Sequence, residues 1–373
     1  MSPKRCIFQL ALLPIIQAVF FYSVAQSACP CMDESLCQPI SFPDRKEILG
    51  FVVSQSNWMK YNWSEITTLA MFTNLSSDLM CYAHSKGVRV VISASYPVDQ
   101  LGDEDKRKMW VQTQLETVQQ IYADGINIDI EDPTQNGTNQ SSLLTALVSE
   151  VYTAFKSANM NYQVTFDVAW SPDCIDGRCY QYDQLAKWTD FLVIMAYDER
   201  SQIFGPCVAS ANSALPTTAH GLQRYLDLGI NASHLVLGLP WYGYDYPCVN
   251  LSDDNICTIS EVPFRGVNCS DAAGRQRTYA DIRELIRSST SIIVWNTTLE
   301  TPYFDYKMNG TEHQVWYDDP ESLQLKYIYA KQHAVRGLAF WNVDSLDYSD
   351  SPFAMKLTAE MWEAVSVFLG DSN

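Results

Sequence analysis

The stretch Asp124-Gly-Ile-Asn-Ile-Asp-Ile-Glu131 decides how the rest of the chain is interpreted. It has the isoleucine-rich composition of a buried strand, and side chains of a strand alternate between two faces. Asn127, Asp129 and Glu131 therefore share one face, opposite the isoleucines. Burying an amide and two carboxylates costs free energy unless these groups meet partners or a ligand. We predict that this face looks into a binding or catalytic site.

Further apolar runs have the composition of strands, and most of them alternate with amphipathic segments. The strand-like runs cover residues 48–53, 67–72, 88–95, 164–170, 191–198, 235–241 and 337–341. Helices are expected around residues 75–85, 106–122, 144–155, 181–188, 222–226, 325–330 and 357–368. This alternation predicts a parallel (β/α)8 TIM barrel, with an open doubly wound sheet as the alternative. No GxGxxG or GxxxxGK segment follows an early strand, so a nucleotide site has no support.

Residues 246–317 interrupt this alternation of strands and helices. They contain cysteines, four Asn-x-Ser/Thr sequons and short strand-like pieces rather than another strand and helix pair. We predict that they form a small α+β subdomain, inserted after the seventh strand of a catalytic barrel that spans residues 29–373.

The first residues have the features of a secretory signal peptide. Lys4 and Arg5 precede an apolar run, and small residues follow it. We predict a signal peptide over residues 1–28, cleaved at 25–28. The formal net charge of −18 disfavours nucleic acid and anionic membrane partners.

The cysteines support the same route through the secretory pathway. Of the 11 cysteines, Cys6 lies in the predicted signal peptide, and the even number that remains favours disulfides. Cys174 is expected to pair with Cys179, and Cys248 with Cys257 or Cys269. Scattered histidines and the lack of paired CxxC motifs argue against a metal site. Sequons at nine positions mark candidate surface loops for glycans.

Chemically active residues stand where the expected strands end, which is where the active site of such a barrel lies. These residues are Glu131, Trp170, Asp198, Trp241 and Trp341. A purely structural network of Asp129 and Glu131 with a cation is disfavoured, because the strand contains no lysine or arginine. Asp124 is expected to fix the entry of the strand, and Asp167 receives no role.

The motifs resemble one family. Asp124–Glu131 is similar to the DGxDxDxE signature of the family-18 glycoside hydrolases, the chitinase family. Met195-Ala-Tyr-Asp198 resembles the MxYD motif on the sixth strand of that family, and Trp341 the tryptophan that ends its eighth strand. Pro240–Tyr246 and Gln314–Asp318 look most similar to a lysosomal branch that cleaves chitobiose. The resemblance covers nearly the whole chain after the signal peptide.

The resemblance implies roles for individual residues. Glu131 would be the general acid that protonates the leaving oxygen, and repulsion from the neighbouring carboxyl is expected to help it keep its proton. This family uses substrate-assisted catalysis, in which the 2-acetamido oxygen of the sugar attacks the anomeric carbon. Asp129 would orient that acetamide, and Tyr197 would hydrogen-bond it. The implied substrate-binding residues are Trp341, Asp198, Asn127, Met195 and Trp241.

Two departures from the family pattern stand out. Asn127 occupies the place of a third aspartate found in most chitinases, so the proton relay between two aspartates cannot operate as it does there. Its amide can still hydrogen-bond Asp129. The third strand ends Ser93-Ala-Ser95 in place of the usual SxGG.

The expected function is that of a lysosomal glycosidase. It would hydrolyse the GlcNAc-β1,4-GlcNAc bond of chitobiose cores of asparagine-linked glycans from the reducing end, with retention. The alternatives are a chitinase-like lectin that binds GlcNAc glycans without cleavage, and an endochitinase; secretion is the alternative location. We expect a monomer whose partner is an oligosaccharide containing GlcNAc, with no nucleic acid, membrane, cofactor or metal.

Overall fold

The computed structural model describes residues 28–41, 45–135 and 137–370. The predicted signal peptide over residues 1–28 lies outside the described residues, except for Ala28. Within the described ranges, no helix combines the length and the apolar character needed to cross a membrane.

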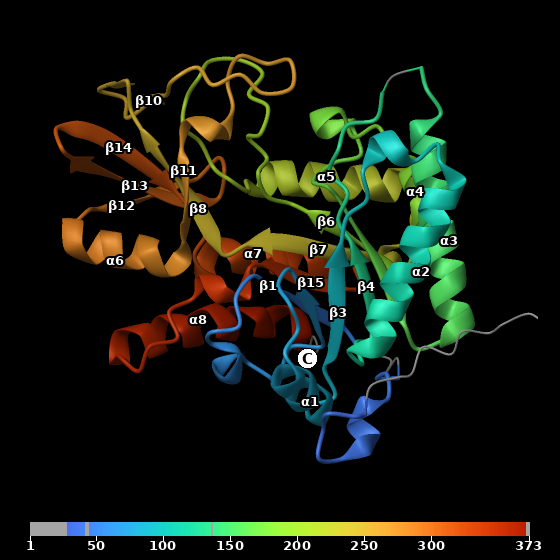
Figure 1. Ribbon diagram of the computed structural model, residues 1–373. Coiled ribbons are helices and arrows are strands. Elements are labelled where there is room, and N and C mark those ends of the chain that lie inside the picture. The colour runs from blue at the N-terminus through green and yellow to red at the C-terminus, as the bar shows by residue number, and fades with distance from the viewer. Residues whose placement is uncertain (1–27, 42–44, 136, 371–373) are drawn as a thin grey trace, which may run out of the picture.

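Eight parallel strands close into a barrel, which confirms the predicted fold (Figure 1). The strands follow the order β1-β15-β7-β6-β5-β4-β3-β2 around it. Their bounds are β1 (Glu47–Val52), β2 (Thr68–Met71), β3 (Arg89–Ala94), β4 (Gly125–Ile128), β5 (Gln163–Ala169), β6 (Phe191–Met195), β7 (Leu235–Pro240) and β15 (Gly337–Trp341). Most of these strands are buried on both faces, which explains their nearly continuous apolar sequences.

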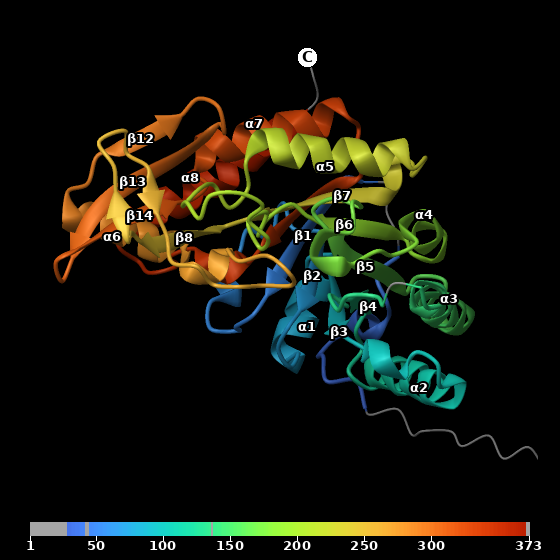
Figure 2. The same ribbon diagram turned by 90° about the horizontal axis from the view of Figure 1, so that it is seen from above.

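Helices cover the outside of the barrel (Figure 2). They are α1 (Ser77–Ser85), α2 (Glu104–Gln120), α3 (Gln140–Ala158), α4 (Tyr182–Leu185), α5 (Leu215–Asp227), α7 (Pro320–Gln332) and α8 (Pro352–Leu369). The side chains of Ser76, Asp103, Asp319 and Ser351 cap four of these helices by accepting backbone N–H groups. Only a short 3-10 turn, Trp58–Lys60, lies between β1 and β2, in keeping with the brevity of that connection.

The interior of the barrel is a packed core below the site. Side chains from alternating positions fill it, and all of them are fully buried: Leu49, Phe51, Ala70, Val91, Phe191, Val193, Val236 and Ala339. This core leaves ligand access only at the ends of the barrel, and the site lies at the carboxyl ends of the strands.

Asp124 fixes the entry of β4, as its position in the sequence predicted. Its carboxylate accepts hydrogen bonds from the backbone N–H of Ile40 at 2.7 Å and of Val90 at 2.6 Å. The other contact is to Nε2 of His84, at 2.8 Å. These buried contacts tie the N-terminal segment and α1 to the start of β4, so Asp124 stabilises the fold rather than serving the chemistry.

A second sheet stands to one side of the barrel, on the left in Figure 1. Its five strands follow the order β11-β8-β14-β13-β12, and β9 with β10 forms a separate pair. The bounds are β8 (Tyr242–Pro247), β9 (Asn250–Leu251), β10 (Cys257–Thr258), β11 (Arg275–Thr278), β12 (Ile293–Asn296), β13 (Thr301–Met308) and β14 (Thr311–Trp316), with α6 (Tyr279–Ser289) beside them. The sheet begins at Tyr242 rather than at residue 246, because β8 follows β7 after a single residue.

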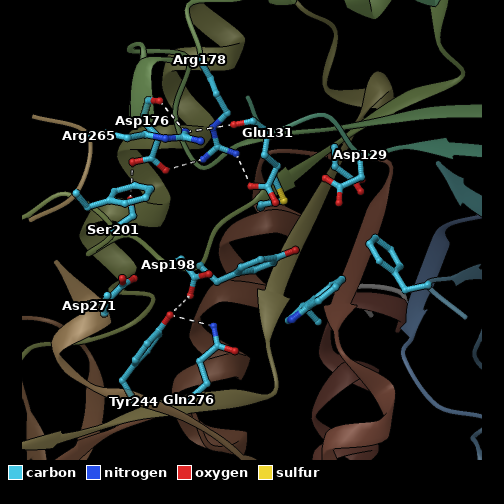
Figure 3. A pocket seen from close by; sticks show the side chains of 17 residues that line it. Asp129, Glu131, Asp176, Arg178, Asp198, Ser201, Tyr244, Arg265, Asp271 and Gln276 are labelled. Atoms are coloured by element: carbon cyan, nitrogen blue, oxygen red, sulfur yellow. Dashed lines mark hydrogen bonds and ion pairs between the residues drawn. The ribbon is translucent and has the colours of Figure 1, made fainter. Parts of the chain in front are cut away.

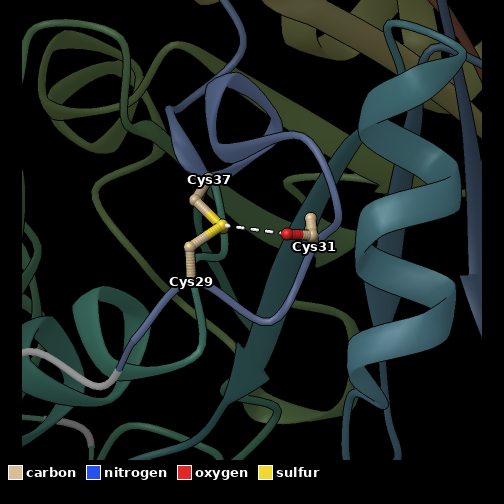
Figure 4. Close-up of side chains that lie close together, drawn as sticks. All are labelled: Cys29, Cys31 and Cys37. Carbon is tan, nitrogen blue, oxygen red and sulfur yellow. Dashed lines mark hydrogen bonds between the residues drawn. A yellow bond between two sulfur atoms is a disulfide. The ribbon is translucent and has the colours of Figure 1, made fainter.

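Five disulfides join the ten cysteines outside the predicted signal peptide. The pairs Cys174–Cys179 and Cys248–Cys257 confirm the predictions, and the others are Cys29–Cys37, Cys31–Cys81 and Cys207–Cys269. Figure 4 shows Cys29, Cys31 and Cys37 close together, and their three sulfur atoms lie within 4.8 Å of one another. Because all three are oxidised, this cluster offers no thiolate for a metal ion.

Candidate active site

A cavity of about 410 Å³ opens where the barrel strands end, between the barrel and the second sheet (Figure 3). Its size is in the range of small-molecule sites. Six residues predicted from the sequence line it: Asp129, Glu131, Met195, Tyr197, Asp198 and Trp341. The structure therefore brings together residues from β4, β6 and β15 that are far apart in the sequence.

Asp129 and Glu131 lie just beyond the end of β4, which closes at Ile128. The backbone N–H of Asp129 still donates to Ala94 of β3 at 2.9 Å, so the ladder continues far enough to fix the direction of this side chain. The Oδ1 atom of Asp129 is buried and has no hydrogen-bond partner among the described residues. Burial and the nearby carboxylate of Glu131 raise the pKa of Asp129 to about 7.

Glu131 forms an ion pair that the strand sequence did not reveal. Its Oε2 accepts a hydrogen bond from Nη1 of Arg178 at 2.7 Å, while 53% of the Glu131 side chain stays exposed. Nη2 of the same guanidinium donates to Asp176 at 3.0 Å. A cation therefore does face the carboxylate pair, but it comes from the loop after β5. The accessible side of Glu131 is left for a substrate.

The loop after β5 is held in place from two directions. The Cys174–Cys179 disulfide closes it, and Asp176 and Arg178 lie within the closed segment. From the loop between β10 and β11, Nη1 of Arg265 donates to the backbone carbonyls of Asp176 at 2.7 Å and Glu131 at 3.2 Å. The insertion thus helps to hold the backbone that carries the acid.

Aromatic and sulfur-containing side chains form the apolar part of the cavity. The Trp341 ring is half-buried, with its centroid 4.9 Å from that of Phe72 and 6.4 Å from that of Tyr197. Met195 lies in the same wall. The hydroxyl of Tyr197 is buried without a hydrogen-bond partner among the described residues. A flat apolar surface beside an unpaired hydroxyl suits a sugar ring that carries a polar substituent.

Asp198 belongs to a polar cluster on the side of the second sheet. It accepts hydrogen bonds from the hydroxyls of Tyr242 and Tyr244, the latter at 3.0 Å, and Gln276 donates to Tyr244 at 3.0 Å. Burial, with a contribution from Asp198, raises the pKa of Asp271 to about 7. The cluster supplies both donors and acceptors for sugar hydroxyl groups.

Two of the predicted substrate-binding residues, Trp241 and Asn127, do not line the cavity. Trp241 is fully buried in the core, where its ring lies 4.5 Å from Phe340 and 4.9 Å from Trp362, so it cannot form a wall of the cavity. Asn127 is also fully buried, below the site. Its amide nitrogen donates to Thr165 at 3.0 Å and Asp167 at 2.8 Å, where the sequence had suggested Asp129 as the partner.

Several lining residues escaped the sequence analysis. They are Phe72, Asp176, Arg178, Ser201, Arg265, Asp271 and Gln276. Most lie in loops or in the insertion, where no periodic pattern marks them. One signal was available for Arg178, because a cysteine pair predicted to close a short loop also predicts that the residues between them are held in a fixed conformation.

The buried carboxyls predict how stability depends on pH. Burial is the largest cause that raises the pKa values of Asp129 and Asp271 to about 7 and of Glu199 to about 8. An unfolded carboxyl titrates near pH 4, so between about pH 4 and pH 8 the native state binds more protons than the unfolded state. The free energy of unfolding should therefore fall as the pH rises through this window. We expect a melting temperature several degrees higher at about pH 5 than at about pH 8.

Glu199→Gln offers a matched control for this prediction. Glu199 is buried outside the cavity and accepts hydrogen bonds from the Ala214 N–H and the Thr218 hydroxyl. The oxygen of a glutamine can accept the Ala214 N–H while its NH2 group donates to the Thr218 hydroxyl oxygen, but the glutamine cannot titrate. The variant should show a weaker dependence of melting temperature on pH, as measured by differential scanning calorimetry. A wild-type melting temperature that stays flat or rises from pH 5 to pH 8 would contradict the assignment.

The fold and the cavity together define a class of protein. Carboxylates at the ends of parallel barrel strands, beside an aromatic floor, are the arrangement with which glycoside hydrolases attack a sugar. Comparison with known proteins defines the family more narrowly. Residues 46–345 match the family described as glycosyl hydrolases family 18. The chain belongs to this family.

Individual relatives are similar over nearly their full length. The chain is 45% identical over 359 residues to a mouse protein named Di-N-acetylchitobiase, covering 96% of this chain and 97% of the relative. A human protein of the same name is 45% identical over 365 residues, covering 98% and 95%. Among solved structures, a family-18 chitinase from Cycas revoluta superimposes with a TM-score of 0.69 at 20% identity, covering 87% of this chain and all of that one. That structural likeness supports the fold.

Proposed function

We propose that this chain hydrolyses the GlcNAc-β1,4-GlcNAc bond of chitobiose cores from asparagine-linked glycans, acting from the reducing end. The observation that carries the proposal is the 45% identity, over nearly the whole of both chains, to proteins named Di-N-acetylchitobiase. The cavity supports it, since Glu131, Asp129 and Tyr197 all line one space. The substrate is accordingly an oligosaccharide that contains GlcNAc.

Glu131 is the proton donor in this proposal. Its proton goes to the glycosidic oxygen as the bond from that oxygen to the anomeric carbon breaks. In the structure Glu131 accepts from Arg178, as a carboxylate does. To act as an acid, Glu131 must first take up a proton, and its exposed side gives solvent access for this step.

The substrate supplies the nucleophile. The acetamide oxygen attacks the anomeric carbon and forms a cyclic oxazolinium ion. Water then opens this ion with overall retention and gives its proton to the Glu131 carboxylate, which restores the acid. The Asp129 carboxylate would accept the acetamide N–H and balance the developing positive charge. The unpaired hydroxyl of Tyr197 would donate to the acetamide oxygen. Oδ1 of Asp129 and the hydroxyl of Tyr197 are buried without a hydrogen-bond partner among the described residues, so neither atom must give up a hydrogen bond to bind the sugar.

Binding of the sugar ring would divide between the two sides of the cavity. Trp341 and Met195 would support the apolar face of the ring, while Asp198 with its tyrosine partners would bind hydroxyl groups. Enclosure by these groups also excludes water, which would otherwise compete with the acetamide for the anomeric carbon.

Two rival functions make different use of the same cavity. A lectin would bind GlcNAc glycans without cleavage, but it needs no acid, whereas Glu131 is present with one side accessible. An endochitinase would require an extended cleft for a longer chain. Both rivals are open to a direct test with defined sugars.

The test is incubation with N,N′-diacetylchitobiose, with its reduced alcohol and with long chitin oligomers, followed by product analysis. We expect cleavage of the disaccharide to GlcNAc. We expect a slower reaction of the alcohol, because an enzyme that acts from the reducing end would contact the second ring, and reduction opens that ring. Binding without cleavage at any acidic pH would favour the lectin. Cleavage of long oligomers but not of the disaccharide would favour the endochitinase.

We further propose that the protein is a lysosomal monomer. The disulfides fit passage through the secretory pathway, and the higher stability expected in acid fits an acidic compartment. Co-localisation of the full-length protein with a lysosomal membrane marker, and light scattering of the purified protein, test the two parts separately. Recovery mainly from the medium would point to secretion instead.

A further inference from the structure

Asp167 of β5 lines the cavity but has no part in the steps described so far. The register of β4 and β5 pairs Asn127 with Thr165 and Ile128 with Phe166. One residue further along, this register places Asp129 beside Asp167. Neighbours in register point to the same side of a parallel sheet and lie about 5 Å apart. The carboxyl of Asp167 is thus the cross-strand neighbour of the group that would face the acetamide.

The surroundings of Asp167 offer no cation on either neighbouring strand. Only 2% of the residue is exposed, and one carboxyl oxygen, Oδ1, accepts the amide N–H of Asn127 at 2.8 Å. On its other side β5 pairs Asp167 with Val193 of β6, which is apolar and fully buried. The titratable groups that act on it are carboxyls and a phenol: Asp129 and Glu131 after β4, and Tyr197 after β6.

Two carboxylates held this close in a buried site cannot both carry a negative charge, so one of them keeps a proton. Burial and the neighbouring Asp129 raise the pKa of Asp167 well above its ordinary value. Arg178 acts on Asp129 and favours its ionised form, whereas Asp167 faces the apolar Val193 on its other side. Asp129 therefore ionises first, and Asp167 remains the neutral partner.

We infer that Asp167 is a positioning residue that stays a carboxylic acid and donates its O–H to the carboxylate of Asp129. This inference rests on the proposed function, in which Asp129 faces the acetamide as an anion while the positive charge of the oxazolinium ion develops, because that charge favours the ionised carboxyl at acidic pH. One oxygen of Asp167 is held by Asn127, and the other carries the proton. In the commoner family pattern, an aspartate at the position of Asn127 is the carboxyl beside Asp129. Here Asp167 on β5 supplies that neighbouring carboxyl instead. Glu131 alone gives a proton to the substrate, and Asp167 keeps its own.

The first test compares Asp167→Asn, Asp167→Ala and the double variant Asn127→Asp with Asp167→Ala. An asparagine amide can replace the donated O–H, so Asp167→Asn should keep kcat within a few-fold of wild type. Asp167→Ala removes a hydrogen bond to a charged group and should lower kcat about 10- to 100-fold, with less change in KM. Restoring an acid on β4 in the double variant should recover much of this loss.

The kinetic results that overturn the inference are specific. Asp167→Asn as slow as Asp167→Ala would mean that a carboxylate, not a neutral donor, is needed. Wild-type turnover in Asp167→Ala would mean that Asp129 needs no partner. Failure of the double variant to improve on a folded Asp167→Ala would mean that the loss comes from packing rather than from the hydrogen bond.

A second readout does not depend on turnover. The infrared spectrum of the wild type at about pH 8, above the pKa of Asp129, should contain a protonated-carboxyl band that is missing from Asp167→Asn. No difference between the two spectra would overturn the inference even if the alanine variant failed to fold. Failure of the wild type to cleave chitobiose would instead contradict the proposed function, and the infrared comparison would still decide the protonation state of Asp167.

Discussion

Glu131→Gln should reduce hydrolysis of N,N′-diacetylchitobiose by about 10²- to 10⁴-fold while the folded protein still binds the disaccharide. Glutamine has the size of glutamate but cannot deliver a proton to the leaving oxygen. Its amide can still contact Arg178 through the carbonyl oxygen, so the loop after β5 should stay in place. Turnover is measured by GlcNAc release, and binding by isothermal titration calorimetry.

The leaving group provides a sharper form of this test. An aryl glycoside of GlcNAc with an acidic phenol needs little protonation, so Glu131→Gln should lose far less activity on it than on the disaccharide. Glu150→Gln is a matched control, because it also removes a carboxylate from an ion pair with an arginine. Neither Glu150 nor its partner Arg107 lines the cavity. Equal losses on both substrates, or unchanged turnover of the disaccharide, would remove Glu131 from the role of acid.

Asp129→Asn should lower kcat by about 10²- to 10³-fold with a smaller change in KM. The amide is neutral and can turn its donor side toward the acetamide N–H, so it neither orients that group nor balances the positive charge of the oxazolinium ion. The effect should fall on kcat because the charge develops only as the bond breaks. Steady-state kinetics on the disaccharide measure both constants.

A stable ring analogue of the oxazolinium ion tests whether Asp129→Asn lowers kcat because the positive charge is no longer balanced. A thiazoline derivative of GlcNAc resembles the cyclised intermediate and should bind wild type more tightly than Asp129→Asn. Equal affinity, or a loss confined to KM, would mean that Asp129 contributes to ground-state binding of the sugar and not to the transition state.

Much of the fold follows from the sequence because the signals are local. Each barrel strand is a short apolar run, and the helices between them are amphipathic, so β1 to β7 and β15 were all expected near their observed positions. The exception is the end of β4: the sequence pattern runs to Glu131, but the strand stops at Ile128. Alternation of side chains continues past that point, which is why the predicted face was still correct.

The sequence predicted the cavity-lining residues that lie at strand ends, and it missed those that lie in loops. Asp129, Glu131 and Tyr197 were found because a barrel gathers its strand ends at one place. Arg178 lies 47 residues from Glu131 in a loop, and no periodicity connects the two. Trp241 was misplaced for a related reason: it follows β7, but its side chain turns outward into the helix layer.

The most direct test of the account follows the wild-type reaction by proton NMR with two substrates. One is N,N′-diacetylchitobiose, and the other is the same disaccharide with a free amine on the non-reducing sugar. We predict that the non-reducing sugar of the first substrate is released as β-GlcNAc before mutarotation, beside the anomeric mixture that the reducing-end sugar already carries. The second substrate should not be cleaved, because it lacks the participating acetamide. Release of the non-reducing sugar as the α-anomer, or comparable cleavage of the amine, would contradict substrate-assisted hydrolysis by this cavity.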